Sequence, residues 1–444
     1  MGRIEALAQR YRSGDTTPED VARAQLALAA GNDAHSIFTQ LTPELALAQA
    51  RASTERWARG TPLGPLDGVP LTVKDLFDLE GTATTRGSRV TGRAPAQRDA
   101  ACVARLRAAG AVVLGKTSLS EFAFSGLGLN PHFGTPVQRA PRTGATHLVG
   151  GSSSGAAAAL RAGIGCVALG SDTSGSVRVP AAWSGLVGWR PSQARYPLDG
   201  VALLAPSLDT VGVLASSVAD VLAMDAVLHG EQPQLADTAP TFVFAANLCG
   251  GKVQHEVRDN CARFMARVAD AGFACEEARV VALEQVMDAF AAHGTLVAAE
   301  AAHELRAFTE PAVARHVDPF VQRRLAAARE MRAHDLIALQ QLRHRLLQEA
   351  ASVPQDVIYV FPTTPATAPA LAALHTPERI AAANASALSH TMPCSFLDMP
   401  GIALPSGHDG AGLPTSVLLC CPRGRDALLL SAARRLEALA LFNP

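Results

Sequence analysis

Two glycine–serine segments, Gly150-Gly-Ser-Ser-Ser-Gly155 and Ser171-Asp-Thr-Ser-Gly-Ser-Val-Arg-Val-Pro180, carry most of the information in this sequence. A third segment lies upstream, Gly68-Val-Pro-Leu-Thr-Val-Lys74-Asp75, and its lysine is one of only three in the chain. Together the segments supply serine hydroxyls and an amine base, the groups needed to attack an unreactive carbonyl. One such segment alone is weak evidence, but all three in this order predict an enzyme with a serine nucleophile.

These segments resemble the motifs of the amidase signature family, which uses a Ser-Ser-Lys triad. The family pattern Gly-Gly-Ser-Ser-(Gly/Ser)-Gly aligns with Gly150–Gly155 and implies that Ser152 is the bridging serine. The pattern (Ser/Thr)-Asp-Thr-Gly-Gly-Ser-(Val/Ile)-Arg aligns with Ser171–Arg178 and implies that Ser176 is the nucleophile. The separation of the two serines matches that of the family, and the family's lysine falls on Lys74.

The resemblance also implies which groups surround the triad. Backbone N–H groups of Thr173, Ser174, Gly175 and Ser176 are expected to bind the oxyanion of the substrate, since a turn of small residues exposes its amides. Ser125, in a loop that resembles one of the family's loops, is expected to contact the substrate or to pack beside it. The family needs no cofactor or metal ion, and none of the 13 histidines belongs to a metal-binding motif.

Two residues depart from the family pattern. Ser174 replaces the first glycine of the usual Thr-Gly-Gly-Ser turn, and only glycine adopts a positive φ without steric cost. We therefore expect Ser174 to restrict this turn and to alter the oxyanion pocket. Ala156 stands where relatives often carry Ser or Glu, which removes no member of the triad. The resemblance further implies a cis peptide bond between Gly151 and Ser152.

The triad can act as a proton relay. Ser176 needs a base because its hydroxyl is a poor nucleophile at neutral pH, and Ser152 can pass the proton to Lys74. Lys74 must then be neutral at rest, so its pKa must fall from about 10.4 to about 7, which requires roughly 4–5 kcal/mol. Burial on an apolar strand supplies this by desolvation. We predict an amidase that hydrolyses linear carbon–nitrogen bonds through an acyl-enzyme.

Three charged residues in these segments have a structural interpretation. Asp75 and Asp172 could be mistaken for acid–base residues, but we expect them to hold backbone and hydroxyl groups near the triad. Arg178 is expected to pair with a neighbouring group by an ion pair or hydrogen bond.

Strands and helices alternate on both sides of the motifs, which is typical of an α/β/α layered domain. On the strand at 67–74, Val69, Leu71 and Val73 are expected on one face and Thr72 with Lys74 on the other. The resemblance implies an α/β/α sandwich with one large, mixed, twisted sheet. We expect a single amidase domain over 1–444, with a signature core at 66–195 and an embedded helical, pocket-forming elaboration at 230–390.

The predicted elements follow from apolar periodicity and from capping residues. Helices are expected from Pro18, at Pro43–Arg59, Arg98–Ala109, Ala156–Ala162 and Val253–Ala271, over much of 283–352, and at Asp426–Leu441. Further strands are expected at Ala111–Leu114, Val167–Leu169, Phe242–Ala246, Ala278–Ala282, Asp356–Phe361, Ile402–Pro405 and Thr415–Leu419.

Composition excludes several functions. The chain has 444 residues, 48% of them hydrophobic and 18% charged, which suits a large buried core. A formal net charge of −1 gives no excess of positive charge that would indicate binding to nucleic acid or to an anionic membrane. The eight cysteines form no C-x-x-C pair, and no signal pattern is evident, so we expect a cytoplasmic protein. A small amide is the expected binding partner; the oligomeric state stays open, with a homodimer as one option.

Three alternatives compete with this interpretation. Gly110–Thr117 fits the P-loop pattern around Lys116, but its middle residues are apolar and strand-like, whereas a phosphate cradle is a flexible loop. Ser153 fits the nucleophile elbow of an α/β-hydrolase esterase, which needs an acid and a histidine downstream. The histidines available for that role are His293, His303 and His390. The third alternative is the A subunit of a tRNA-dependent amidotransferase, which delivers ammonia to a partner.

Overall fold

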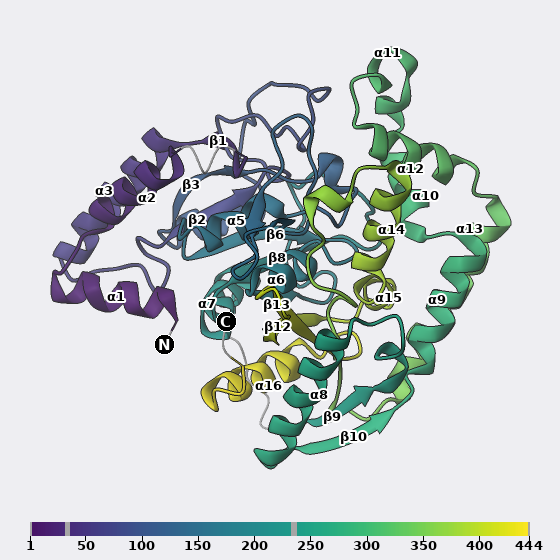
Figure 1. Ribbon diagram of the computed structural model, residues 1–444. Helices are drawn as coiled ribbons and strands as arrows, with labels where there is room; N and C mark the ends of the chain where they lie inside the picture. The colour runs from purple at the N-terminus through teal and green to yellow at the C-terminus, as the bar shows by residue number, and fades with distance from the viewer. Residues whose placement is uncertain (1, 32–35, 232–237, 443–444) are drawn as a thin grey trace.

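A single sheet organises this protein. The computed structural model describes residues 2–31, 36–231 and 238–442. Within them, 11 strands form one sheet through the centre of the molecule (Figure 1). In spatial order they are β1 (Phe38–Leu41), β3 (Val112–Thr117), β2 (Pro70–Lys74), β6 (Val167–Asp172), β8 (Thr210–Ala215), β7 (Val187–Arg190), β12 (Gly401–His408), β13 (Pro414–Cys420), β11 (Val357–Pro362), β9 (Thr241–Ala245) and β10 (Ala274–Ala278).

The sheet is mixed, as predicted. Strand β2 pairs in parallel with β3 and β6, and β9 pairs in parallel with β10 and β11. The remaining neighbours in the sheet are antiparallel, including β6 with β8 and β12 with β13. Because β2 and β6 are adjacent and parallel, their carboxyl ends bring Lys74 close to the segment that follows Asp172. A separate hairpin joins β4 (Val137–Arg139) and β5 (Thr146–Leu148).

Helices cover both faces of the sheet, which confirms the predicted α/β/α layering. Successive residues of a strand point to opposite faces. Val113 of β3 therefore packs into the larger core, and Val112 and Leu114 pack into a second one. The larger core contains residues of α1 (Arg3–Ser13), α4 (Ala101–Ala108), α7 (Val218–His229) and α16 (Asp426–Ala438). The opposite face carries α2 (Pro18–Ala29), α3 (Pro43–Ala58), α5 (Ser154–Arg161) and α6 (Arg178–Ser184).

The predicted start of α2 is confirmed by its cap. The Thr17 hydroxyl accepts a hydrogen bond from the Asp20 amide, and the Asp20 carboxylate accepts one from the Thr17 amide. Pro18 occupies the first turn, where its missing N–H has no helical partner to lose.

The segment at 230–390 contributes to the sheet as well as to the helices. Strands β9, β10 and β11 lie within it, beside α8 (His255–Asp270). Its other helices are α9 (Val281–His293), α10 (Leu296–Glu304), α11 (Pro311–Ala314), α12 (Pro319–Arg329), α13 (Ala333–Glu349) and α14 (Pro377–Leu388), followed by α15 (Thr391–Phe396). Helices α9–α13 lie on one side of the molecule and α1–α3 on the opposite side (Figure 1).

The strand predicted at Ala278–Ala282 is wrong. The strand β10 ends at Ala278, and α9 begins at Val281. Four of the five β10 residues are exposed, so this edge strand is held by its backbone pairing with β9 and not by burial of side chains. An apolar pattern therefore could not locate it.

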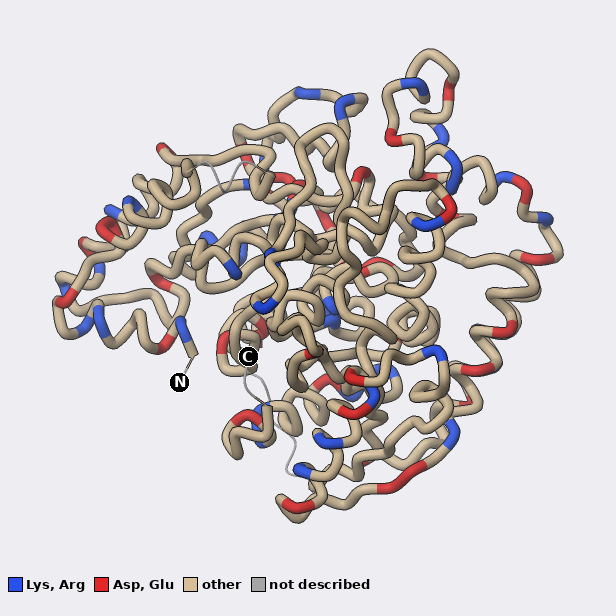
Figure 2. The backbone as a smooth tube through the Cα atoms, in the orientation of Figure 1, with Lys and Arg blue, Asp and Glu red and all other residues tan. Residues whose placement is uncertain are grey.

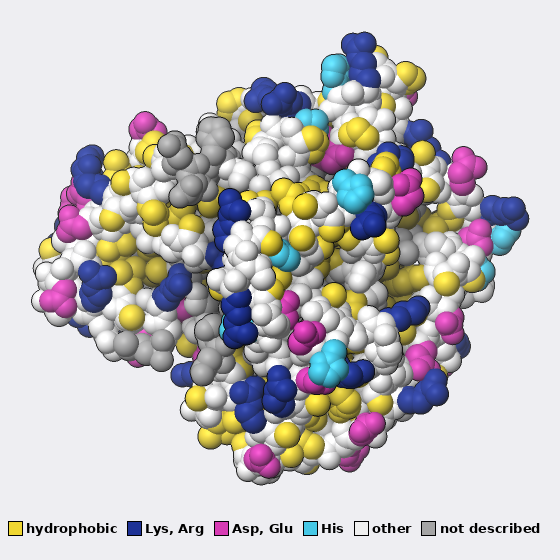
Figure 3. All heavy atoms as spheres, in the orientation of Figure 1, with side chains coloured by type: hydrophobic (Ala, Val, Ile, Leu, Met, Phe, Trp, Pro, Cys, Tyr) yellow, Lys and Arg dark blue, Asp and Glu magenta, His cyan; other side chains and the backbone are white. Residues whose placement is uncertain are grey.

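Charges are dispersed over the molecule. Acidic and basic residues alternate along the surface helices (Figure 2), and the face in Figure 3 intersperses both signs with apolar side chains. Among the described residues, none of the helices combines the length and the apolar character needed to span a lipid bilayer.

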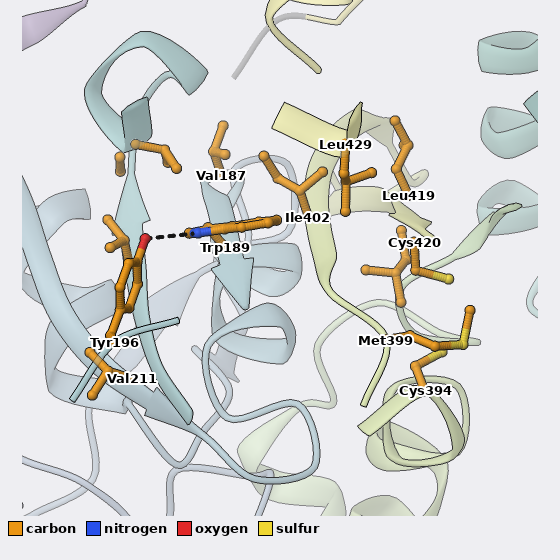
Figure 4. Close-up of a cluster of buried hydrophobic side chains, with 14 of the residues drawn as sticks. Val187, Trp189, Tyr196, Val211, Cys394, Met399, Ile402, Leu419, Cys420 and Leu429 are labelled. Carbon is orange, nitrogen blue, oxygen red and sulfur yellow. Dashed lines mark hydrogen bonds between the residues drawn. The ribbon is translucent and has the colours of Figure 1, made fainter. Parts of the chain in front are cut away.

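The centre of the larger core is filled by side chains of several strands and of α16 (Figure 4). Trp189 of β7 is fully buried, and its indole N–H donates a hydrogen bond to the Tyr196 hydroxyl at 3.1 Å. Ile402 of β12 and Leu429 of α16 belong to the same cluster.

Truncation of this indole should destabilise the whole sheet. Trp189→Ala is expected to lower the free energy of unfolding by about 3–5 kcal/mol, because it leaves a cavity in a close-packed core. Chemical denaturation monitored by circular dichroism measures the change. Leu439→Ala, at a side chain that is 52% exposed, is the control and should shift the midpoint little. Equal midpoints for the two variants would contradict this account of the core.

Candidate active site

Lys74 lies at the carboxyl end of β2, on the face opposite Leu71 and Val73, as predicted. Its side chain is fully buried. Hydrogen bonds join Lys74 Nζ to Ser152 Oγ at 2.7 Å and to Ser171 Oγ at 2.9 Å. The structure thus brings together two of the three predicted triad residues and adds Ser171, which the sequence did not single out.

Lys116 provides an internal comparison, since it is fully buried on the neighbouring strand β3. Its ammonium forms an ion pair with Asp75 at 2.7 Å and donates to Ala83 O and Thr84 Oγ1. Lys74, by contrast, has no carboxylate within 4 Å among the described residues. Lys116 is therefore a structural cation inside a strand, and the nucleotide-binding alternative built on it is wrong.

Burial sets the protonation of Lys74. Desolvation lowers the pKa of Lys74 to about 7, against the opposing fields of Asp172 and Asp209. Removing an ammonium group from water disfavours its charged form, and a lysine without a contacting carboxylate regains little of that cost. Near neutral pH a substantial fraction of Lys74 is thus an uncharged amine, with its nitrogen in contact with a serine hydroxyl.

Ser152 lies just before α5 and is also fully buried. The peptide bond between Gly151 and Ser152 is cis, which confirms the implication of the resemblance. The Gly151 amide donates to Gly126 O at 2.9 Å, and the Ser120 amide donates to Ser152 O at 3.2 Å. These backbone contacts fix the loop against the segment that contains Ser125.

Ser176 follows β6 in a tight turn and is 4% exposed. The Ser153 amide donates to Ser176 O at 3.2 Å, so the two glycine–serine segments are joined directly. Asp172, at the end of β6, accepts hydrogen bonds from the amides of Gly175 at 2.7 Å and Val177 at 3.1 Å. It also binds the Arg178 guanidinium at 2.9 and 3.0 Å.

The expected structural role of Asp172 and Arg178 fits these contacts. Burial opposes the ionisation of Asp172, but the guanidinium groups of Arg178 and Arg190 outweigh it and lower the pKa of Asp172 to about 2. The carboxylate therefore stays charged and clamps the turn. Asp75 has the same kind of role beside Lys116, and it accepts hydrogen bonds from the Thr85 amide and hydroxyl.

The four amides predicted to bind an oxyanion differ in their availability. The Gly175 amide is engaged by Asp172. The amides of Thr173, Ser174 and Ser176 have no acceptor within the described residues. Three of the four predicted donors are therefore free to bind a ligand.

Ser174 does not take the positive φ of this turn, and its expected effect on the oxyanion pocket stays a prediction. The positive φ of this turn falls on Gly175, at +135°, and Ser174 is absent from the left-handed region. A side chain at Ser174 therefore costs no backbone strain, whereas the glycine that remains is the one that the geometry requires.

Helix α15 holds the turn from a distant part of the sequence. The Thr391 hydroxyl donates to Ser174 O at 2.5 Å, and Arg178 donates to Ser395 Oγ at 2.7 Å. The sequence motifs did not identify either hydroxyl as a contact of the turn.

Ser125 lies after the short helix η2 (Glu121–Ala123) and is 6% exposed. Its hydroxyl donates to Asn384 Oδ1 at 3.1 Å, and the Gly126 amide donates to the same oxygen at 2.8 Å. Asn384 belongs to α14, so the loop at Ser125 is tied to the segment at 230–390. The contact of Ser125 with substrate stays a prediction.

The esterase alternative at Ser153 lacks its partners. The Ser153 hydroxyl is fully buried and donates to Ser171 O at 3.4 Å. Of the candidate histidines, His293 binds Asp335, His390 binds Pro362 O, and His303 lies beside Arg306. Within the described residues, none of them contacts Ser153.

Comparison with known proteins agrees with this geometry. A sequence model described as Amidase matches residues 20–430. The chain belongs to the amidase family. It is 34% identical to 2-amino-5-chloromuconic acid deaminase of Comamonas testosteroni over 86% of this chain and 83% of the relative. It is 39% identical to the A subunit of the Glutamyl-tRNA(Gln) amidotransferase of Cupriavidus taiwanensis, over 53% of this chain and 46% of the relative.

Solved structures share this fold over nearly the whole length of the chain. A structure described as crystal structure of amidase superposes with a TM-score of 0.86 at 30% identity, covering 99% of this chain and 100% of the other. These comparisons confirm the predicted family, fold class and enzyme class of this protein.

The requirement for glycine at position 175 can be tested directly. A Cβ at Gly175 would overlap Thr391 Oγ1, and its φ disfavours any other residue. Gly175→Ala is expected to displace the turn and reduce kcat/KM on an amide substrate by about two orders of magnitude, since donors near the reacting atoms would move.

Gly144→Ala is the control that separates the effect of a steric clash from the effect of backbone strain. Gly144 has a φ of +70° but nothing within 4 Å of the added Cβ, so it tests strain alone. Comparable activity of the two variants, measured at equal folded fraction, would show that the contact with Thr391 is unimportant.

Proposed function

We propose that this protein hydrolyses the carbon–nitrogen bond of a linear amide through an acyl-enzyme formed on Ser176. The observation that carries the proposal is the 2.7 Å contact between Ser152 Oγ and the buried, carboxylate-free amine of Lys74. A lysine in this environment can accept a proton near neutral pH, which its neighbour Lys116 with its ion pair to Asp75 cannot do as readily.

The first chemical step would use this relay. Ser176 Oγ attacks the amide carbonyl carbon, its proton passes to Ser152, and the proton of Ser152 passes to Lys74. The negative charge that develops on the carbonyl oxygen would be bound by the free amides of the turn. Loss of one such donor costs about 2.7–4 kcal/mol of barrier in other hydrolases.

The same relay would serve the later steps. The Ser152 hydroxyl can protonate the nitrogen of the leaving group, and Lys74 then returns a proton to Ser152. This matters for amides because an unprotonated amine leaves poorly. Once the amine or ammonia has left, water would attack the carbonyl carbon of the acyl-enzyme with its proton taken by the same route, which breaks the ester bond to Ser176 and releases the carboxylate product.

The A chain of an amidotransferase is the second candidate. The higher identity to such a protein, 39%, favours it, but that similarity spans only 53% of this chain. The deaminase similarity spans 86%. Assay of the purified chain on simple amides separates the two, because strict dependence of amide cleavage on added partner proteins would favour the amidotransferase.

Replacement of the two candidate nucleophiles distinguishes the mechanisms. Ser176→Ala is expected to abolish turnover, by about four orders of magnitude or more, because it removes the attacking oxygen. Intact-mass spectrometry after exposure to a panel of amides and esters should detect an acyl adduct in the wild type but not in this variant.

Ser153→Ala is the matched control, since Ser153 lies in the neighbouring segment. Severe loss of activity in Ser153→Ala with tolerance of Ser176→Ala would replace the proposal with an α/β-hydrolase mechanism.

The pH dependence follows from Lys74. The active form has a neutral amine and the pKa of Lys74 is about 7, so kcat/KM should rise tenfold per unit below pH 7 and level off above it. Lys74→Ala should lower the rate by orders of magnitude. Lys74→Arg should not restore it, because a guanidinium keeps its proton.

Lys116→Met controls for the loss of any buried lysine. It should reduce stability without moving the midpoint of the pH profile. A profile that stays flat from pH 5 to 9 in the wild type would rule out Lys74 as the base.

A further inference from the structure

Asp209 is a buried carboxylate to which the proposed mechanism assigns no part. It lies immediately before β8 and is 5% exposed. It accepts a short hydrogen bond from Thr173 Oγ1, and its other oxygen accepts from the amides of Leu204 at 2.8 Å and Ala205 at 3.0 Å. One carboxylate thus joins the turn that contains Ser176 to a second loop.

Thr173 is the first residue of that turn. Its amide is one of the three without an acceptor, and its hydroxyl is held by Asp209 alone among side chains of the described residues. The Thr210 hydroxyl also donates to Asp172 O at 3.0 Å, so the end of β6 and the start of β8 are fixed together. A shift of Asp209 would therefore redirect the Thr173 amide.

The second loop is held by the segment at 230–390. Ser207 donates through its amide to Glu300 of α10 at 2.9 Å, and its carbonyl accepts from Arg343 of α13 at 3.0 Å. At the other end, Arg86 donates to Leu203 O at 2.8 Å. The loop that ends at Asp209 thus connects helices of this segment, through Ser207, to the turn at Ser176, through Asp209.

We infer that Asp209 is a positioning residue for amide hydrolysis: its carboxylate orients the amide of Thr173 toward the oxyanion and couples that amide to the loop at 203–209. The inference rests on the proposed function of Ser176. It assigns Asp209 no contact with substrate. Its effect should therefore fall on kcat more than on KM, because the oxyanion develops only in the transition state.

The charge of Asp209 acts on the base as well. The charged groups that interact with it are Lys74 on β2, Arg86 in the loop after β2, and Glu300 on α10. Burial raises the pKa of Asp209 to about 6, while the hydrogen bond from Thr173 and those from two amides oppose this, so the group is largely ionised at pH 7. An anion near Lys74 favours its ammonium form, so removing the charge should move the acid limb of the kcat/KM profile to lower pH.

Variants at both ends of the hydrogen bond test the inference. Asp209→Asn, which keeps the shape but removes the charge, and Thr173→Val, which removes the hydroxyl, are each expected to lower kcat about 10- to 100-fold with KM within threefold. The double variant should be no slower than the slower single variant, since both changes break one interaction. Thr173→Ser should recover most of the kcat lost in Thr173→Val, and Asp209→Asn should shift the acid limb downward.

The control is Ser192→Ala, which loses a buried hydrogen bond from a hydroxyl to the Asp426 carboxylate but touches neither Thr173 nor Asp209. It should leave kcat within twofold. Unchanged kcat in Asp209→Asn and Thr173→Val, or an equal loss in Ser192→Ala, would overturn the inference. Ser176→Ala is assayed in parallel, because activity that survives in that variant refutes the proposed function itself and not the role of Asp209.

Discussion

The uncompensated burial of one amine is the constraint on which this site depends. Lys74 lies inside the sheet, where desolvation disfavours its charged form, and among the described residues it has no contacting carboxylate. Lys116 is equally buried one strand away, and burial lowers its pKa too, but its ion pair with Asp75 opposes that shift. Two residues of one type on adjacent strands therefore have different chemistry. The difference comes from a single carboxylate, and it leaves Lys74 able to act as a proton acceptor near neutral pH.

The turn at Ser176 must be rigid for such a base to be useful. Asp172 fixes it from within the motif through the amides of Gly175 and Val177. Thr391 fixes it from α15, more than two hundred residues later in the chain. The only residue of the turn with a strongly positive φ is the glycine packed against Thr391, so the sequence departure at Ser174 is tolerated.

The segment at 230–390 is connected to two of the loops that surround this turn. Asn384 holds the loop at Ser125, and Glu300 holds the loop that ends at Asp209. Through the inferred role of Asp209, the helices of the segment at 230–390, which contain none of the motif residues, would help to position the oxyanion donors.

The sequence alone predicted the family and the layered α/β fold, because the three motifs define the family, and the resemblance to that family implied the contact between Lys74 and Ser152. It also located most helices and central strands, whose burial imposes a regular apolar pattern. It misplaced β10, an exposed edge strand that carries no such pattern, and it did not predict β1, β7 or β8, although every residue of β7 and β8 is buried. Only the tertiary structure decided that Lys74 lacks a counter-ion while Lys116 has one, that Gly175 and not Ser174 takes the positive φ, and that Thr391 and Asp209 reach the turn. These features depend on contacts between segments far apart in the chain, and local sequence does not encode which segments meet.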